Sequence, residues 1–184
     1  MSAAIHREWW PRPSTAALDE IKAGNQRMNI SDPIRSHAQA SPDAEAIVPR
    51  SGRAISYREL DQTIDFLAAG LQGLGLAAGT IVGIRTARLY RYICVCLALA
   101  RLGAATAPGF VPGSKLAFCL IDGPVPDEPE TKFEPLARYW PGDRARLTDV
   151  PAVPSHQDGA AVCALFPTSG TTGTPKLVAV SHDV

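Results

Sequence analysis

The sequence predicts an α/β protein in which strand–helix–strand units build a mostly parallel sheet. The first observation is the β-prone run Thr80–Ile84, which is followed by a long apolar stretch with helical spacing and then by a short strand pattern at Ala104–Ala107. A helix between two strands is the usual connection in a parallel βαβ unit with a right-handed crossover. The second observation is an amphipathic helical pattern ahead of this unit. The third is a glycine- and threonine-rich stretch between two strand patterns near residue 170, which predicts a hairpin with a long loop.

The amphipathic pattern begins with a capping box, S-Y-R-E, in which Ser56 and Glu59 each satisfy a backbone donor of the other. Apolar residues then recur at helical spacing at positions 60, 64, 67 and 71, and the polar residues Asp61, Gln62 and Asp65 are expected on the other faces. Gly73 and Gly75 are expected to end the helix.

The helix of the βαβ unit is expected to start at Thr86 as its cap and to end at Gly103. Its core stripe is predicted from the apolar spacing of Leu89, Ile93, Cys96, Leu97 and Ala100. Val95 and Leu99 widen this stripe, so the helix should be buried nearly all round.

Weaker patterns surround these elements. A helix is expected from Asp32, as N-cap before Pro33, to the residue before Ser41. Residues 46–48 and 54–56 predict a hairpin, and residues 115–121 predict one more strand. Residues 124–154 contain seven prolines and predict a long surface connection. Residues 1–30 show no sustained period, and Trp9-Trp10 fits either an arm packed on a neighbouring surface or a disordered one.

Composition excludes several functional classes. The 184 residues carry 18 basic and 18 acidic side chains, so net charge gives no attraction to nucleic acid or to an anionic membrane. The longest apolar run, Tyr92–Ala100, is far shorter than the ~20 residues of a membrane helix, and the N-terminus lacks the apolar core of a signal peptide. The four cysteines form no C-x-x-C pair and are expected to be buried free thiols. We therefore expect a soluble, cytoplasmic protein.

The stretch from Phe166 to His182 reads F-P-T-S-G-T-T-G-T-P-K-L-V-A-V-S-H and carries the chemistry of an anion site. Its glycines let the backbone turn its N–H groups outward, its hydroxyl residues add donors, and Lys176 adds a positive charge. These features predict a loop that holds the phosphates of a nucleotide. An ordinary surface loop, with Lys176 merely solvated, is the alternative, since loops are rich in the same residue types.

This loop is not a Walker A loop. From Gly170 the chain reads G-T-T-G-T-P-K-L, so Pro175 replaces the second glycine of G-x-x-x-x-G-K-[ST] and Leu177 replaces the hydroxyl residue. A strand pattern, and not a helix, follows Lys176.

The stretch instead resembles the phosphate loop of the adenylate-forming superfamily, which includes acyl-CoA synthetases, aryl-acid ligases and adenylation domains of nonribosomal peptide synthetases. The family pattern is roughly [ST]-[ST]-G-[ST]-T-G-x-P-K-G ahead of a short strand and Ser-His. The chain matches it from Thr168 to Lys176 and at Ser181-His182, and departs from it at Leu177, where glycine is usual. The runs S-Y-R-E-L, G-T-I-V-G-I and L-A-L-A-R-L-G-A also follow the family's order.

The resemblance implies that the fold is the N-terminal part of the large domain of an adenylate-forming enzyme and ends in a phosphate-loop hairpin. It implies ATP with Mg²⁺ as cofactors, a carboxylic acid as substrate, and a coenzyme A or carrier-protein thiol as acyl acceptor. The residues that would hold the β- and γ-phosphates are Thr168, Ser169, Gly170, Thr171, Thr172, Gly173 and Lys176.

The resemblance also implies that parts of the site are missing from these 184 residues. The family's magnesium-holding glutamate, ribose-binding aspartate and mobile lysine lie after the phosphate loop, so no catalytic residue and no metal ligand are assigned here. We expect residues 1–30 to form an irregular arm and residues 31–184 to form a truncated N-terminal portion of an adenylation domain. The strands on either side of the loop are expected to belong to a sheet whose remaining strands lie beyond residue 184, in the rest of a ligase or in a partner chain. A C-terminal complementing fragment is the partner that this implies.

Three interpretations remain open at this point. The chain is the N-terminal piece of a ligase, a non-catalytic remnant that acts as a binding or interaction module, or an unrelated phosphate-binding protein with a similar loop.

Overall fold

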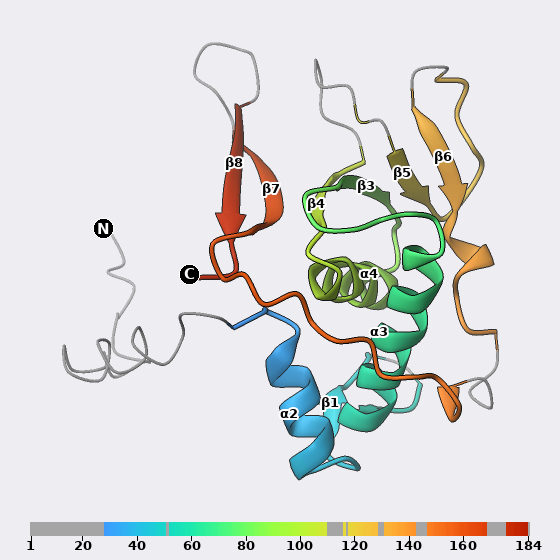
Figure 1. Ribbon diagram of the computed structural model, residues 1–184. Helices are drawn as coiled ribbons and strands as arrows, with labels where there is room; N and C mark the ends of the chain where they lie inside the picture. The colour runs from blue at the N-terminus through green and yellow to red at the C-terminus, as the bar shows by residue number, and fades with distance from the viewer. Residues whose placement is uncertain are drawn as a thin grey trace, which may run out of the picture.

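A computed structural model describes residues 28–50, 52–109, 116, 118–128, 131–142, 147–168 and 176–183. Its centre is a six-stranded sheet in the order β6-β5-β3-β4-β7-β8 (Figure 1). The five strands from β6 to β7 pair in parallel, and only β8 is antiparallel to its neighbour. The predicted α/β class with a mostly parallel sheet is therefore confirmed.

The predicted βαβ unit consists of β3 (Ile81–Arg85), α4 (Leu89–Arg101) and β4 (Ala105–Pro108). Strands β3 and β4 pair in parallel from Ile81 opposite Ala105 to Ile84 opposite Pro108. Strand β5 (Phe118–Ile121) pairs with the other side of β3, so the chain returns across β3 after completing the unit. The carboxyl ends of β3, β4 and β5 consequently meet at one edge of the sheet.

Helix α3 (Tyr57–Gln72) begins directly after Ser56, where its capping pattern predicts. The backbone N–H of Glu59 donates to Ser56 Oγ at 3.3 Å, and the chain leaves the helix at Gly73 and turns through Gly75 with a φ of +81°. The four predicted apolar residues, Leu60, Ile64, Leu67 and Leu71, are all buried. Asp65, which the pattern placed on a face other than the apolar stripe, is buried as well, and it contacts Arg101 and Arg35 there.

Helix α4 is shifted from the prediction. It begins at Leu89, and Thr86 lies ahead of it, with its Oγ1 accepting from the backbone N–H of Arg88. Leu89 is 72% exposed and belongs to no core stripe. The helix buries the set Cys94, Val95, Ala98, Leu99, Ala100 and Arg101. The prediction that this helix is buried nearly all round is wrong, because Leu89 is exposed and Ile93, Cys96 and Leu97 are only half-buried. The sheet and α3 cover one face of the helix and leave the rest partly open.

The helices form a layer in which α4 contacts β4, α3 packs on α4, and α2 packs on α3 (Figure 1). Helix α2 (Asp32–Ala40) starts one residue earlier than predicted, with Ser31 as its N-cap and Asp32 as its first residue. The short strands β1 (Glu45–Ile47) and β2 (Ile55–Ser56) pair antiparallel as the predicted hairpin between α2 and α3.

The proline-rich connection contains more structure than the sequence predicts. Strand β6 (Lys132–Pro135) adds to β5 in parallel, and the short helix η1 (Leu136–Arg138) follows it. Leu136 is fully buried and joins the core cluster with Phe118 and Leu120. The connection is therefore not entirely a surface loop, because its first half supplies one edge strand and a core residue.

Strands β7 (Val162–Thr168) and β8 (Lys176–Ser181) join this same sheet, and not a separate one as expected. Strand β7 pairs in parallel with β4 at Thr106 and Ala164, and β8 then forms the edge. Strand β4 pairs with β3 on one side and with β7 on the other. The hairpin therefore joins the sheet without a strand from another polypeptide.

The cysteines behave as small apolar residues. Cys94, Cys119 and Cys163 are buried, Cys96 is half-buried, and all four are free. Burial raises the pKa of the Cys94 thiol to about 12 and the pKa values of Cys96 and Cys119 to about 11. These thiols are therefore neutral and poorly nucleophilic near neutral pH. Among the described residues, no helix has the length and apolar character that would let it cross a membrane.

Candidate functional site

The β7–β8 hairpin carries the predicted phosphate loop. The two strands pair antiparallel from Val162 opposite Ser181 to Thr168 opposite Lys176. Thr168 and Lys176 thus lie across from each other at the point where the hairpin leaves the sheet. Ser169, Gly170, Thr171, Thr172 and Gly173 connect these two residues and lie outside the described part of the chain. The structure therefore brings together the first and last predicted site residues.

The end of the hairpin that bears the loop is open to solvent. Phe166 and Thr168 of β7 are exposed, and Phe166 is 50% exposed. Their partners in β8 include Val178, which is 48% exposed, opposite Phe166. Leu177, the residue that departs from the family pattern, lies opposite Pro167 and is also partly exposed. The described end of the hairpin accordingly presents an exposed apolar surface made by Phe166, Leu177 and Val178.

The base of the hairpin is fixed to the rest of the fold. Cys163 is buried there, and Thr106 Oγ1 of β4 donates to its carbonyl at 3.3 Å. His182, which follows β8, is buried, and its backbone N–H donates to the carbonyl of Ala161. The hairpin thus combines an anchored base with an exposed loop end.

A buried network of charges fixes the segment that leads into β7. We call this segment, residues 151–158, the strap. Asp65 Oδ1 of α3 accepts from Arg101 Nη1 and Arg35 Nη2, each at 2.6 Å, and from the backbone N–H of Val153 at 2.9 Å. Asp61 accepts from Arg101 Nη2 at 2.8 Å. Two arginines and two aspartates therefore balance their charges while they join α2, α3, α4 and the strap.

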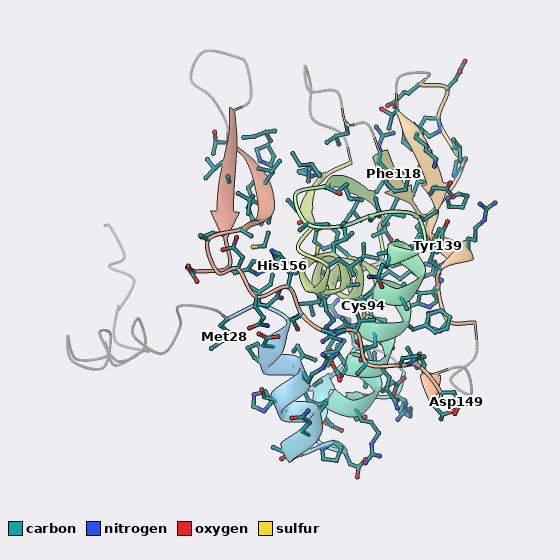
Figure 2. All side chains as sticks on the ribbon, viewed as in Figure 1. Met28, Cys94, Phe118, Tyr139, Asp149 and His156 are labelled. Atoms are coloured by element: carbon teal, nitrogen blue, oxygen red, sulfur yellow. The ribbon has the colours of Figure 1, made fainter. Side chains whose placement is uncertain are left out.

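The strap is held a second time at the end of α4. The backbone N–H of His156 donates to the carbonyl of Arg101 at 2.8 Å, and Asn29 Nδ2 donates to the carbonyls of Ala100 and His156. Figure 2 labels His156 where the strap passes α4, and Met28 where the chain enters α2. These contacts set the position from which the chain enters β7, and with it the position of the hairpin.

Sequence reasoning missed this network although it contained a signal. Arg101 ends the otherwise apolar run C-V-C-L-A-L-A-R, and its side chain is fully buried. A charged side chain inside an apolar helix face needs a charged partner. Asp61 and Asp65, one helical turn apart on α3, are the partners that such a search would have found.

A surface hollow of about 510 Å³ lies beside this network and not at the loop. It is lined by Ala69 and Gln72 of α3, by Arg101 and Leu102, and by residues 151–156 of the strap. It contains none of the predicted site residues. In the described part of the chain there is also no group of three or more histidine, cysteine or acidic side chains placed to hold a metal ion.

Comparison with known proteins shows which proteins this chain is similar to. Residues 34–115 match the family model described as AMP-binding enzyme. The chain is 30% identical over 191 residues to the nonribosomal peptide synthetase agiA of Aspergillus flavus, an alignment that covers 90% of this chain and 2% of that protein. It is 29% identical over 192 residues to the hybrid PKS-NRPS synthetase thnA of Trichoderma harzianum, covering 94% of this chain and 5% of that one.

Solved structures show the same relationship. The N-terminal subdomain of Klebsiella oxytoca NpsA, in complex with 3-hydroxyanthranilyl-AMSN, matches with a TM-score of 0.68 at 26% identity, covering 86% of this chain and 42% of that one. VinN shares the fold, with a TM-score of 0.68 at 22% identity, covering 86% of this chain and 46% of that one. The chain thus spans less than half of these solved relatives and a small fraction of the curated ones. Family model, sequence relatives and fold agree that this chain belongs to the adenylate-forming superfamily and corresponds to its N-terminal portion.

Proposed function

We propose that residues 168–176 hold the β- and γ-phosphates of ATP, and that the chain is the N-terminal part of a ligase that activates a carboxylic acid as an acyl-adenylate. The observation that carries the proposal is the strand register, which brings Thr168 and Lys176 opposite each other across a loop of glycine and hydroxyl residues. Such a loop presents N–H and O–H donors and a positive charge to one anion.

The role of the loop in the reaction follows from where negative charge develops. A carboxylate oxygen of the substrate forms a bond to the α-phosphorus of ATP, the bond from that phosphorus to the bridging oxygen breaks, and pyrophosphate leaves. Donors and the Lys176 ammonium placed on the β- and γ-phosphates stabilise this leaving group as it gains charge. The same contacts hold the α-phosphorus where the carboxylate can reach it.

Magnesium ordinarily accompanies ATP and neutralises phosphate charge when bound. The loop of residues 168–176 contains no carboxylate, and the described residues hold no metal-binding cluster. The residues present therefore do not fit a magnesium site, and we assign no step to the metal in this chain.

The first prediction tests the loop. Lys176→Ala is expected to weaken binding of ATP or pyrophosphate about 10–100-fold, because a hydrogen bond to a charged group contributes about 1.5–3 kcal/mol. Isothermal titration calorimetry measures the change. Lys132→Ala is the matched control, since Lys132 is exposed on β6 and pairs only loosely with Glu134, at 3.8 Å. Equal affinity in the wild type and in Lys176→Ala would remove the basis of the proposal.

The proposed partner is a C-terminal portion that completes the active site. The open edge of β8 and the exposed side chains of Phe166, Leu177 and Val178 support this proposal. An apolar edge strand is a template for pairing with further polypeptide, and clustered apolar surface marks interaction sites. The acyl acceptor would be the thiol of coenzyme A or of a carrier protein.

The second prediction separates a ligase from a binding module. The 184-residue chain alone is expected to give no ATP–pyrophosphate exchange above a heat-treated control, because losing even one charge-stabilising group costs about 10²–10³ in rate. Exchange is to be assayed with acetate, medium-chain fatty, aryl and amino acids. Exchange that appears when a separately produced C-terminal portion is added supports the ligase. Nucleotide binding without exchange under both conditions supports the non-catalytic module instead.

A further inference from the structure

His182 joins the two ends of the described chain. Its Nδ1 accepts a hydrogen bond of 3.1 Å from the backbone N–H of Ile30, just ahead of α2. The imidazole is buried, with 5% of the residue exposed, directly after β8. One side chain therefore connects the exit of the β7–β8 hairpin to the entry of α2.

The segment that His182 contacts is itself tightly held. Asn29 is buried, and its Nδ2 donates to the carbonyls of Ala100 and His156, at 2.7 and 3.0 Å. Its Oδ1 accepts from the backbone N–H and the hydroxyl of Ser31. Residues 29–31 are thus fixed to the end of α4 and to the strap, so the His182 contact ties the hairpin to a rigid support.

The geometry requires a neutral imidazole. Because Nδ1 accepts a hydrogen bond from the Ile30 N–H, the ring must carry its own proton on Nε2. Nε2 is buried and has no hydrogen-bond partner among the described residues. A protonated ring would point an Nδ1–H at the Ile30 N–H, and the two donors would repel each other.

The surroundings favour the neutral form. Burial lowers the pKa of His182 below its ordinary value, and the nearby His156 lowers it further. Three carboxylates near the ring act on the pKa in the opposite direction, those of Asp183, Asp32 and Asp158. Burial is the largest of these influences, and the direction of the shift is downward.

We propose that His182 is a pH-dependent latch, which in its neutral form holds the Ile30 backbone and fixes the base of the β7–β8 hairpin, and which releases Ile30 when it is protonated. The latch would adjust the position of the hairpin relative to α2 and the strap. It depends on the contacts at residues 29–31, 156 and 182 and not on whether the loop binds a nucleotide.

The third prediction tests the latch by pH-dependent hydrogen exchange measured by NMR on the full chain. Since the folded pKa of His182 is lowered, the Ile30 bond is complete at neutral pH and is lost as pH falls through that pKa. Below it, Ile30 protection, corrected for intrinsic exchange, is expected to fall about tenfold per pH unit as the neutral fraction falls. The amide of Ala105, which donates to Thr80 within the sheet, is the internal reference and is expected to keep its protection.

Two variants make the result specific. In His182→Asn the side-chain oxygen takes the place of Nδ1 but does not titrate, so Ile30 protection is expected to be independent of pH. In His182→Ala the protection is expected to be low at every pH. Three outcomes would each overturn the proposal: wild-type protection that does not change with pH, the same decline in His182→Asn, or an equal decline at Ala105, which would indicate global unfolding.

Discussion

Replacing Asp65 with alanine is expected to lower the free energy of unfolding by about 3 kcal/mol, the lower end of the range for breaking a buried ion pair. The substitution removes the acceptor of Arg101, Arg35 and the Val153 N–H. Arg101, whose side chain is fully buried, keeps Asp61 as its partner at 2.8 Å, which places the loss at the lower end. Urea unfolding followed by circular dichroism measures the change.

Asp43→Ala is the matched control for this experiment. Asp43 forms an ion pair with Arg58 at 3.3 Å, but its side chain is 88% exposed. An exposed pair contributes about 0–1 kcal/mol, so this variant should unfold nearly as the wild type does. Similar losses in both variants would show that the buried network does not fix the strap.

The effect should extend beyond stability. Because Asp65 holds Val153, its loss is expected to increase hydrogen exchange at the strap more than at the central strands β3 and β4. An apolar replacement of the pair, Asp65→Leu with Arg101→Met, should recover much of the lost stability, because the desolvation cost of both charges disappears. If the double variant has no higher free energy of unfolding than Asp65→Ala, the loss of stability does not come from an unpaired buried charge.

Gly103→Ala is expected to destabilise the chain by about 2–5 kcal/mol, the sum of two costs. Gly103 has a φ of +73°, and a residue with a Cβ in this left-handed region loses about 1–2 kcal/mol. A Cβ at this position would also lie 2.7 Å from the ring of His156 and 3.0 Å from Ala78. Relieving that clash requires the strap to move, and overpacking of this kind destabilises a protein by about 1–3 kcal/mol. Thermal or urea unfolding of the variant measures the total.

Gly75→Ala separates the two costs. Gly75 has a φ of +81°, but a Cβ there would meet no atom within 4 Å. This variant should show the backbone cost alone, and the difference between the two variants measures how firmly His156 is held against Gly103. Equal destabilisation would mean that the strap moves freely at His156.

The sequence predicted the elements whose signals are local. The capping box and the regular apolar spacing located α3, and the alternation of strand, helix and strand gave the parallel pairing of β3 and β4. A helix cap, a glycine at a helix end and an apolar stripe all act within a few residues, so one sequence is enough to find them. Residues 168–176 resemble a phosphate loop, and the motifs before them follow the order of the adenylate-forming family. Together they indicated the family that the comparisons support. The contacts that residues 169–175 make within the site remain a prediction.

The tertiary structure decided which predicted faces are buried and which distant segments meet. Leu89 fits the helical spacing yet is exposed, whereas Arg101 and Asp65 are buried because each supplies the charge that the other needs. Strand β7 joins β4 across 57 residues of sequence separation, and β6 adds an edge strand from a region that reads as a loop. His182 meets Ile30 across 152 residues. The sequence by itself determined the local elements and the chemistry of the loop. Only the tertiary structure decided which charges pair in the interior and how the hairpin is anchored. Those contacts join segments that are far apart in the sequence, and no local pattern indicates which distant segments will pack together.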